Sequence, residues 1–504
     1  MKPLPYVKII LRCYILAVIF LKAATVVLFI LYTANILAVL FIIFTNRKSA
    51  ASSLSWLLFL MFVPVVGFIF YFFIGSTSKI SLLSRRFRQP SLESNYLRIS
   101  ENYFDGQEFC YDSTTNSLIR LNLCNSLCKI TYDNNAQLLV DAQQKYPLLL
   151  KELEEAKQSI NILYFIFKPY DKIGIKISDI LCKKASQGVE VRFIYDCMGN
   201  LPSSAFKKTF SRLEKSGVLV CRHLPSLFKS FVQVNYRMHR KIVVIDGKIA
   251  YTGGINIGDD YLGEYPKITP WRDTSVRLTG SCVNPVQLRF LTDWIFIQQL
   301  KKNGESFSKE QISKFFPPPL KQGNMGVQII SSGPDSQRGH IRDCYFKIIC
   351  SAKNYIYIQT PYFAPDETLL DAIIICAKSG VDIRVMLPGI PDKKMIYNVT
   401  LSYVNELLEA GVKVYFHKGF IHAKTFVSDD LISSIGTTNL DIRSFKLDYE
   451  INAVIYDKDF ALENKNIFLK DIESCKEARL KDFKNIGFLK KTLHSVCRLF
   501  SPLV

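Results

Sequence analysis

The sequence holds few of the residues that build metal centres or disulfide frameworks. Histidine occurs six times in 504 residues, and the thirteen cysteines are odd in number, scattered and without a CxxC pair. This distribution lacks the ligand spacing of structural zinc sites and the even cysteine count of small secreted domains. It is typical of a protein whose cysteines remain reduced. We therefore expect neither a zinc framework nor structural disulfides.

Acidic residues are also in deficit. Asp and Glu number 44 against 64 Lys and Arg, which gives a formal net charge of +20. An excess of this size indicates an anionic partner, either a nucleic acid or an anionic membrane surface. With 504 residues, of which 49% are hydrophobic, the chain is long enough for two or three domains with large cores.

Charge is absent from two long stretches near the N-terminus. Residues 23–44 and 54–75 are uncharged, and each has the ~20 residues that a helix needs to cross a bilayer. We expect them to form a two-helix transmembrane hairpin within a membrane anchor at 1–80. The apolar run 9–21 contains Arg12 and is interpreted as an interfacial lead-in. A cleaved signal peptide is the alternative, but no small-residue cleavage site follows cleanly.

Basic residues flank the expected hairpin more densely than they occupy its loop. The loop holds only Arg47 and Lys48. The flanking residues are Lys2, Lys8, Arg12 and Lys22 before the hairpin and Lys79, Arg85, Arg86 and Arg88 after it. Because basic flanks favour the cytoplasmic side, we expect both termini there. The protein would then be a multi-pass cell-membrane protein whose remaining domains are cytoplasmic.

The second half of the chain repeats the first. ASQGVEVRFI (185–194) aligns with AKSGVDIRVM (377–386) at an offset of 192, and SGVLV (216–220) aligns with AGVKV (410–414) at an offset of 194. Such near-constant offsets indicate a duplicated domain. In each copy, helical patterns alternate with short apolar strands, which predicts α/β units with largely buried sheets.

These patterns predict the domain boundaries. After the anchor we expect a linker segment at 81–140, a first repeat at 141–310 and a second at 325–504, joined by a proline-containing linker. The tail from Lys476 mixes basic and apolar residues. It is typical either of an amphipathic helix that rests on anionic lipid or of an ordinary surface helix.

One short motif occurs in both repeats, at an offset of 183. His239 and Lys241 lie two residues apart before an apolar strand, and His422 and Lys424 do the same. In an extended chain, side chains two apart point to one face. Seventeen residues after each histidine comes an asparagine, Asn256 in the first repeat and Asn439 in the second.

This combination of side chains suits a phosphodiester. An ammonium and a carboxamide can hold the non-bridging oxygens, while an imidazole attacks phosphorus or moves a proton. A single His-x-Lys is usually a solvated surface feature. Two complete copies supply the two histidines that a two-step substitution needs, one as nucleophile and one as acid/base.

The full pattern, H-x-K-x4-D-x6-G-[GST] twice, resembles the phospholipase D superfamily, and the chain as a whole resembles the bacterial cardiolipin synthases. The shared blocks include HRKIVVIDGKIAYTGGINIGDDY, WRDT (271–274), SSGPDS (331–336), QTPYFAPDE (359–367), GTTNLDIRSF (436–445) and the closing SPLV. The resemblance implies an α/β fold of two tandem phospholipase D-like α/β/α domains that form a pseudo-symmetric pair.

The resemblance also implies a reaction. A phosphatidyl group would pass from one phosphatidylglycerol to another through a phosphohistidine, giving cardiolipin and glycerol without metal or cofactor. By analogy His239 is the nucleophile and His422 the acid/base. Lys241, Lys424, Asn256 and Asn439 would clamp the phosphate. The partners implied are phosphatidylglycerol and the bilayer, and no nucleic acid is expected.

The aspartates of the two motifs lie far along the chain from the lysines. Asp246 and Asp429 count among the catalytic motif residues, but each lies five residues past its lysine, about 16 Å along a strand at ~3.3 Å per residue. We expect them to be structural. The candidates for orienting a histidine are Asp273 in the first repeat and Glu450 in the second.

Three positions depart from the family pattern. Met238 stands where asparagine is usual, Leu163 where an acidic residue is common, and Thr437 where serine is usual. We expect the change at Leu163 to affect the polar lining of the pocket or the acceptor that it admits.

Other functions remain open from sequence. They are a hydrolytic phospholipase D with water as acceptor, a related transferase with a different acceptor, a nucleic-acid phosphodiesterase and an inactive membrane scaffold. The hairpin argues against the nuclease, and the two complete motifs argue against the scaffold.

Overall fold

The computed structural model describes residues 5–45, 50–63, 67, 111–126, 128–200, 203–223, 236–264, 268–300, 307–318, 320–336 and 339–503. The chain divides into two compact units. The N-terminal unit comprises 1–79 with 226–235, and the body comprises 80–225 with 236–504.

The described residues of the N-terminal unit form two apolar helices. Helix α1 (Pro5–Thr45) runs unbroken for 41 residues, so the expected lead-in at 9–21 and the expected span at 23–44 belong to one helix. Within α1, Arg12–Leu37 is long and apolar enough to cross a membrane, with a mean hydropathy of 2.6. Helix α2 (Ala50–Phe62) covers the start of the second expected span, and most of that span after residue 63 lies outside the described residues. Asn35 of α1 donates a hydrogen bond to the Leu60 carbonyl of α2 at 3.0 Å.

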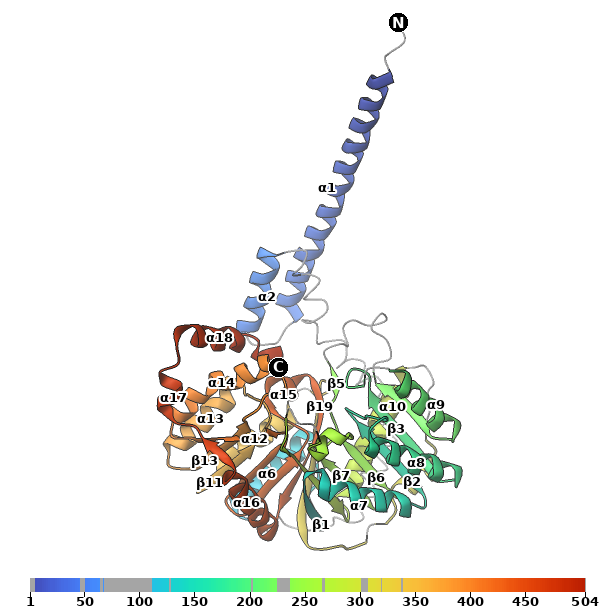
Figure 1. The fold of residues 1–504 in the computed structure, drawn as a ribbon, viewed down its shortest axis with the longest axis vertical. Coiled ribbons are helices and arrows are strands. Elements are labelled where there is room, and N and C mark those ends of the chain that lie inside the picture. Colours follow the sequence, from blue (N-terminus) through green and yellow to red (C-terminus); the bar gives the residue numbers. More distant parts are fainter. Residues whose placement is uncertain are drawn as a thin grey trace. The chain divides into compact units, whose positions relative to one another are not determined.

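The body consists of two α/β halves that share one sheet (Figure 1). The first half is built from β1 (Thr131–Val140), α7 (Asp141–Glu155), β2 (Ser159–Tyr164), α8 (Lys172–Ser186), β3 (Glu190–Asp196), α9 (Ser204–Lys215), β4 (Leu219–His223), β6 (Ile242–Ile245), β7 (Ile249–Gly253), β9 (Thr274–Thr279) and α10 (Val283–Leu300). The second half is built from β10 (Met325–Ser332), α12 (His340–Ser351), β11 (Tyr355–Gln359), α13 (Glu367–Lys378), β13 (Asp382–Pro388), α14 (Lys394–Glu409), β14 (Lys413–His417), β16 (Thr425–Ser428), β17 (Ile432–Gly436), β19 (Asp448–Tyr456), α16 (Lys458–Ile472) and β20 (Cys475–Glu477).

The strand order is nearly symmetric about the centre of the sheet. From one edge it runs β4-β3-β2-β6-β7-β9-β1, and it continues through β10-β19-β17-β16-β11-β13-β14-β20. The halves meet where β1 pairs antiparallel with β10. This arrangement confirms the tandem α/β repeat that the near-constant offsets predicted.

Two segments expected as linkers contribute to the body. Helix α6 (Ser113–Ser126) and β1 lie within residues 81–140, and β1 is a central strand of the sheet. Helix α11 (Lys309–Phe315) lies within 301–324, where Ile312 and Phe315 are buried in the core of the first half.

Strand β6 is apolar along its whole length because helices cover both faces of the sheet. In β6, Val243 and Ile245 pack with α7, α8 and α9 in one cluster, whereas Ile242 and Val244 pack with α10 in another. This alternation is the period of two that an extended strand imposes. The second half repeats it, with α12, α13 and α14 on one face of β11 and β16 and with α16 on the other.

Two short strand pairs cross between the halves. Strand β5 (Arg237–Met238) pairs parallel with β19, so that Arg237 lies opposite Asp448 and Met238 opposite Tyr449. Strand β8 (Trp271–Arg272) pairs parallel with β15 (Phe420–Ile421), so that Ile421 lies opposite Arg272. Each pair ends just before a motif histidine, and this register positions the candidate site.

Candidate active site

The two histidine–lysine pairs lie just before strands β6 and β16, not within them. In both repeats the lysine turns back onto its own histidine. Lys241 Nζ donates to the His239 carbonyl at 2.7 Å, and Lys424 Nζ donates to the His422 carbonyl at 2.5 Å. Each ammonium is therefore held beside its imidazole by a backbone acceptor.

Each imidazole contacts a buried carboxylate from the opposite half. His239 Nδ1 lies 2.8 Å from Glu450 Oε1, and His422 Nδ1 lies 2.7 Å from Asp273 Oδ2. Both carboxylates are fully buried. The candidates Asp273 and Glu450 thus each contact a motif histidine, and in both cases it is the histidine of the other repeat.

The exchange follows from the strand register. Since Met238 lies opposite Tyr449 in the β5–β19 pair, the next residues on the two strands are His239 and Glu450. In the β15–β8 pair, Ile421 lies opposite Arg272, and the next residues are His422 and Asp273. The backbone N–H of His422 also donates to the Arg272 carbonyl at 2.7 Å.

A motif glycine permits the close approach of the two halves. A Cβ atom at Gly254 would lie 2.0 Å from Asp273 Oδ1 and 2.8 Å from the His422 carbonyl oxygen. Any side chain at this position would displace the carboxylate from the imidazole. The Gly in the first copy of the motif is therefore a packing requirement of the site.

Burial shifts the titration of the carboxylates and imidazoles. Desolvation raises the pKa of Asp273 to about 6 and that of Glu450 to about 7, although nearby lysines oppose the shift. Desolvation, together with the charges of Lys241 and Lys424, holds the pKa of both His239 and His422 well below the usual value. Each imidazole therefore lies within electrostatic range of both lysines, so the two motifs form one site.

The lysines are desolvated as well. Burial lowers the pKa of Lys241 to about 8 and that of Lys424 to about 7, with Glu450 and Asp273 opposing the shift. A bound anion would replace the missing solvation and favour the charged ammonium groups. The site is therefore suited to a monoanionic phosphodiester.

The surroundings of the two histidines differ. His422 is flanked by Trp271, Phe420 and Tyr261, whose ring centroids lie 5.5, 6.0 and 6.1 Å away. His239 has Phe165 at 5.1 Å. It also lies within electrostatic range of Asp448, a buried carboxyl whose pKa burial raises to about 7. The symmetry of the motifs does not extend to these neighbours.

The two motif asparagines are buried but engaged differently. Asn256 donates through Nδ2 to the Tyr261 hydroxyl at 2.7 Å and accepts from the Ile166 N–H at 3.2 Å. Among the described residues, Asn439 Oδ1 is buried without a hydrogen-bond partner. Their role as a phosphate clamp stays a prediction. For Asn256, this role requires the hydrogen bond to the Tyr261 hydroxyl to be replaced by one to the phosphate.

The motif aspartates lie at the other end of their strands. Asp246 accepts hydrogen bonds from the backbone N–H groups of Lys157, Gln158 and Ser159 at 2.7–3.2 Å. Asp429 accepts from Lys353, Asn354 and Tyr355 at 2.7–2.9 Å. Both have positive φ, 52° and 50°. Each carboxylate joins a strand-end turn to the start of the neighbouring strand, as expected of a structural residue.

We expect Asp246→Ala to lower stability much more than turnover. Loss of an acceptor shared by three N–H groups should cost about 2 kcal/mol of unfolding free energy. Alanine also tolerates the positive φ poorly, whereas Asn tolerates it. Thermal unfolding of the purified chain measures the loss, with Asp246→Asn as the matched control. A fall in turnover to the level of a histidine variant, without a loss of stability, would contradict this role.

Sequence reasoning missed several residues that support the site. On α7, Lys145 Nζ donates to the Ile255 carbonyl and the Tyr146 hydroxyl donates to the Asn256 carbonyl, both at 2.8 Å. The Thr437 hydroxyl bonds to Glu450. The sequence did hold one signal. Lys145 falls on the buried face of a predicted amphipathic helix, where a charged residue is rare unless it has a partner.

All three family departures, Leu163, Met238 and Thr437, are buried. Leu163 is fully buried in an apolar cluster with Ile194 and Ile242, so the expectation that it lines the pocket is wrong. It faces the α10 side of the sheet. Met238 is buried in β5, and its N–H donates to Asp196 Oδ2 at 3.0 Å.

Comparison with known proteins finds relatives that match nearly the whole chain. A family model described as "Cardiolipin synthase, PLD-like domain" matches residues 149–264 and 345–472, and one described as "Phospholipase_D-nuclease N-terminal" matches 33–76. The major cardiolipin synthase ClsA of Bacillus subtilis is 37% identical over 491 residues, which cover 96% of this chain and 100% of that protein. The cardiolipin synthase of Oceanobacillus iheyensis is 38% identical over 484 residues, 94% of this chain and 98% of that protein.

A solved structure has the same fold. The phosphatidylserine synthase of Haemophilus influenzae aligns with a TM-score of 0.59 at 14% identity, covering 78% of this chain and 100% of that chain. At this identity the likeness concerns the fold alone. It agrees with the tandem α/β arrangement of the body.

Proposed function

The chain belongs to the bacterial cardiolipin synthases of the phospholipase D superfamily, and on this premise we propose that it transfers a phosphatidyl group between two phosphatidylglycerol molecules. The products are cardiolipin and glycerol. The observation that carries the proposal is the exchanged arrangement of two histidine–carboxylate pairs, with a lysine beside each, in one buried site.

In the first step, His239 Nε2 attacks the phosphorus of the donor lipid, and the bond from phosphorus to the oxygen of the headgroup glycerol breaks. The bound phosphate anion offsets the lysine charges that disfavour protonation of His422, so His422 acts as an imidazolium. It gives its proton to that oxygen, and glycerol leaves as a neutral alcohol. Glu450 accepts the Nδ1–H of His239, which leaves the Nε2 lone pair free for attack. Asp273 likewise accepts the Nδ1–H of His422.

In the second step, neutral His422 takes the proton from the hydroxyl of a second phosphatidylglycerol. The resulting oxygen attacks phosphorus, the P–N bond to His239 breaks, and the enzyme returns to its starting state. Lys241 and Lys424 offset the charge of the phosphate oxygens in both steps. Asn256 and Asn439 complete the proposed clamp. No step in this scheme requires a metal or cofactor.

The competing function is hydrolysis, in which water replaces the second lipid. Labelled phosphatidylglycerol supplied in mixed micelles separates the two by their products. We expect cardiolipin together with free glycerol. Phosphatidic acid as the only lipid product would overturn the proposal and favour a hydrolytic phospholipase D.

The pH dependence of kcat/KM should be bell-shaped. As the pH falls through the raised pKa values of Glu450 and Asp273, about 7 and about 6, the carboxylates gain a proton and no longer accept Nδ1–H. As the pH rises through the lowered pKa values of Lys424 and Lys241, about 7 and about 8, the two ammonium groups lose their charge. Activity should therefore fall on both sides of neutral pH.

Initial rates between about pH 5 and 9 check this profile. Lys424→Arg is the informative variant, because Lys424 has the lower pKa of the two lysines and arginine, which stays charged, should move the alkaline limb to higher pH. An acid limb that is missing in the parent chain would contradict the carboxylate role.

We further propose that the anchor at 1–80 is a two-span hairpin, with helices at 23–44 and 54–75 and with both termini cytoplasmic. The body, with phospholipase D-like domains at 141–310 and 325–504, then faces cytoplasmic lipids. The apolar helix α1 and the N-terminal family match support the anchor. A protease site inserted at the loop residues 47–48 should be cut only from outside intact cells, and cleavage from the cytoplasmic side instead would reverse the orientation.

A further inference from the structure

Helix α18 (Phe488–Arg498) carries an apolar face that points away from the body. Six large apolar side chains are exposed between residues 488 and 500: Phe488, Leu489, Leu493, Val496, Leu499 and Phe500. Phe488 and Leu489 are 81% and 83% exposed, and Leu499 is 78% exposed. Single exposed apolar residues are common in soluble proteins, but a contiguous group of this kind marks an interaction surface.

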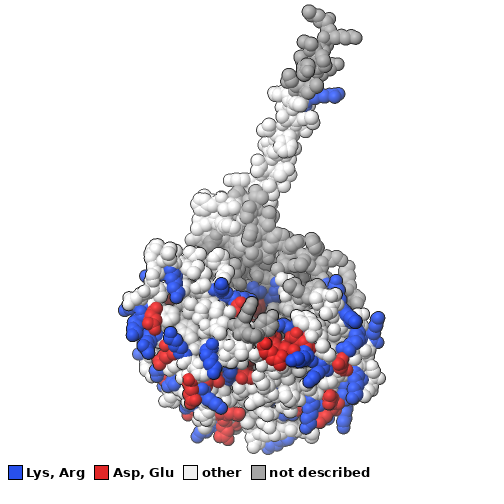
Figure 2. Space-filling model, in the orientation of Figure 1, with Lys and Arg blue, Asp and Glu red and all other residues white. Residues whose placement is uncertain are grey.

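The exposed residues lie on one side of the helix. Leu489, Leu493 and Val496 follow the i, i+4, i+7 spacing of a helical stripe. The buried positions of the helix, His494 and Cys497, lie on a different side. In Figure 2 the surface at α18 is mostly uncharged.

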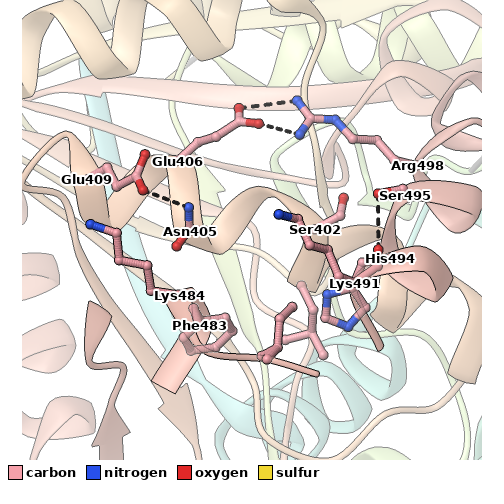
Figure 3. A pocket seen from close by; sticks show the side chains of 12 residues that line it. Ser402, Asn405, Glu406, Glu409, Phe483, Lys484, Lys491, His494, Ser495 and Arg498 are labelled. Carbon is pink, nitrogen blue, oxygen red and sulfur yellow. Dashed lines mark hydrogen bonds and ion pairs between the residues drawn. The ribbon is translucent and has the colours of Figure 1, made fainter. Parts of the chain in front are cut away.

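The side of α18 that faces the body is polar. Arg498 pairs with Glu406 of α14, and its guanidinium lies 4.2 Å from the Tyr403 ring centre. Tyr403 also bonds to Ser501 at 3.0 Å. A cavity of about 390 Å³ separates α14 from α18 and α17 (Leu480–Lys484) (Figure 3). Its polar lining includes Lys484, Lys491 and Ser495.

This orientation is the reverse of a surface helix in a soluble protein, which turns its apolar stripe inward. Folding of the body therefore leaves the apolar face of α18 uncovered within the described chain. The tail is also basic, with seven Lys or Arg residues against two acidic ones between residues 476 and 504. Lys490 and Lys491 directly follow the two most exposed apolar residues.

An apolar stripe flanked by lysines fits the boundary between headgroups and acyl chains of an anionic bilayer. We propose that residues 488–500 form an interfacial segment that seats the body on the surface of an anionic bilayer. The proposal goes beyond the reaction, and it does not depend on which lipid is the acceptor.

The interfacial segment connects to the half of the chain that carries the second motif. The turn η4 (Ser501–Leu503) follows α18 and packs against α15 (Ile442–Lys446). Helix α15 begins three residues after Asn439 of the second motif. Docking of α18 would thus hold the second motif at a set depth relative to the lipid surface.

The test uses the full chain reconstituted into vesicles that contain phosphatidylserine, with a tryptophan introduced by Leu489→Trp. The native Trp56, Trp271 and Trp294 form a common background that the parent chain measures. Ile175→Trp on α8 is the matched control, because Ile175 is also an exposed aliphatic residue. Val496→Trp repeats the test at a second position of the stripe.

We expect lipids with bromine at shallow acyl positions to quench the added emission of Leu489→Trp and Val496→Trp but not that of Ile175→Trp. Quenching should weaken in vesicles made only of phosphatidylcholine. The double variant Lys490→Glu with Lys491→Glu should weaken it in phosphatidylserine vesicles, since each lysine contributes ~5-fold to binding.

Absence of quenching at both stripe positions would overturn the proposal. A concentration-dependent blue shift without quenching would also overturn it, because a second copy of the chain would then cover the stripe. Quenching that is equal in both lipids would overturn the requirement for anionic lipid. None of these readouts requires turnover, so their failure is distinct from failure of the proposed reaction.

Discussion

His239→Ala and His422→Ala are each expected to lower turnover of phosphatidylglycerol by at least about 10³-fold. Each histidine performs a step that the other cannot. While His239 is bonded to phosphorus, His422 has to move the proton. Both imidazoles are buried beside a carboxylate and both lysines, so a water molecule cannot easily take over the function of either imidazole. Cardiolipin formation in mixed micelles measures the loss.

His340→Ala is the control, because His340 is half-buried on α12 and bonds to the Ser331 carbonyl. It should retain most of the activity. Near-normal turnover in either motif variant would contradict the two-histidine scheme.

A donor lipid with a nitrophenyl headgroup assigns the two roles. Nitrophenolate leaves without a proton, so His422→Ala should still release one equivalent in a rapid burst. His239→Ala should release none, because it lacks the attacking nitrogen. The opposite pattern would exchange the nucleophile and the acid/base.

Asp273→Asn and Glu450→Gln are expected to lower turnover by about 10²- to 10⁴-fold. Each carboxamide keeps the shape of the side chain but can no longer accept Nδ1–H as a carboxylate does, so the imidazole adopts the wrong tautomer. Both carboxyls are fully buried, and water cannot compensate. Asp457→Asn is the matched control, because Asp457 caps α16 and asparagine caps helices equally well.

The same nitrophenyl donor tests the exchanged pairing. Because Asp273 contacts His422, Asp273→Asn should keep the burst. Because Glu450 contacts His239, Glu450→Gln should lose it. Pairing within each half would give the reverse result, with the burst lost in Asp273→Asn.

The motif histidines and lysines could be predicted from sequence because they follow a local spacing that is written twice. The α/β repeat could be predicted because apolar strands and amphipathic helices have different periods. The structural position of Asp246 and Asp429 also followed from counting along a strand, since five extended residues carry a side chain too far from the lysine.

The pairing of Asp273 and Glu450 could not be predicted in the same way. A carboxylate in one repeat and a histidine in the same repeat are close in sequence, but the register of β5 on β19 and of β15 on β8 brings the opposite partners together. Leu163 was misplaced for a similar reason, because a strand has two faces and the sequence does not say which one turns to the site.

The sequence by itself determined the family of this protein, the duplication of its α/β domain and the presence of an uncharged N-terminal segment. These depend on residue types and spacings within single segments. The tertiary structure alone decided which carboxylate serves which histidine and which face of α18 is left uncovered. Both depend on how distant segments pack, since a periodic pattern specifies that a helix or strand has two different faces but not what each face meets.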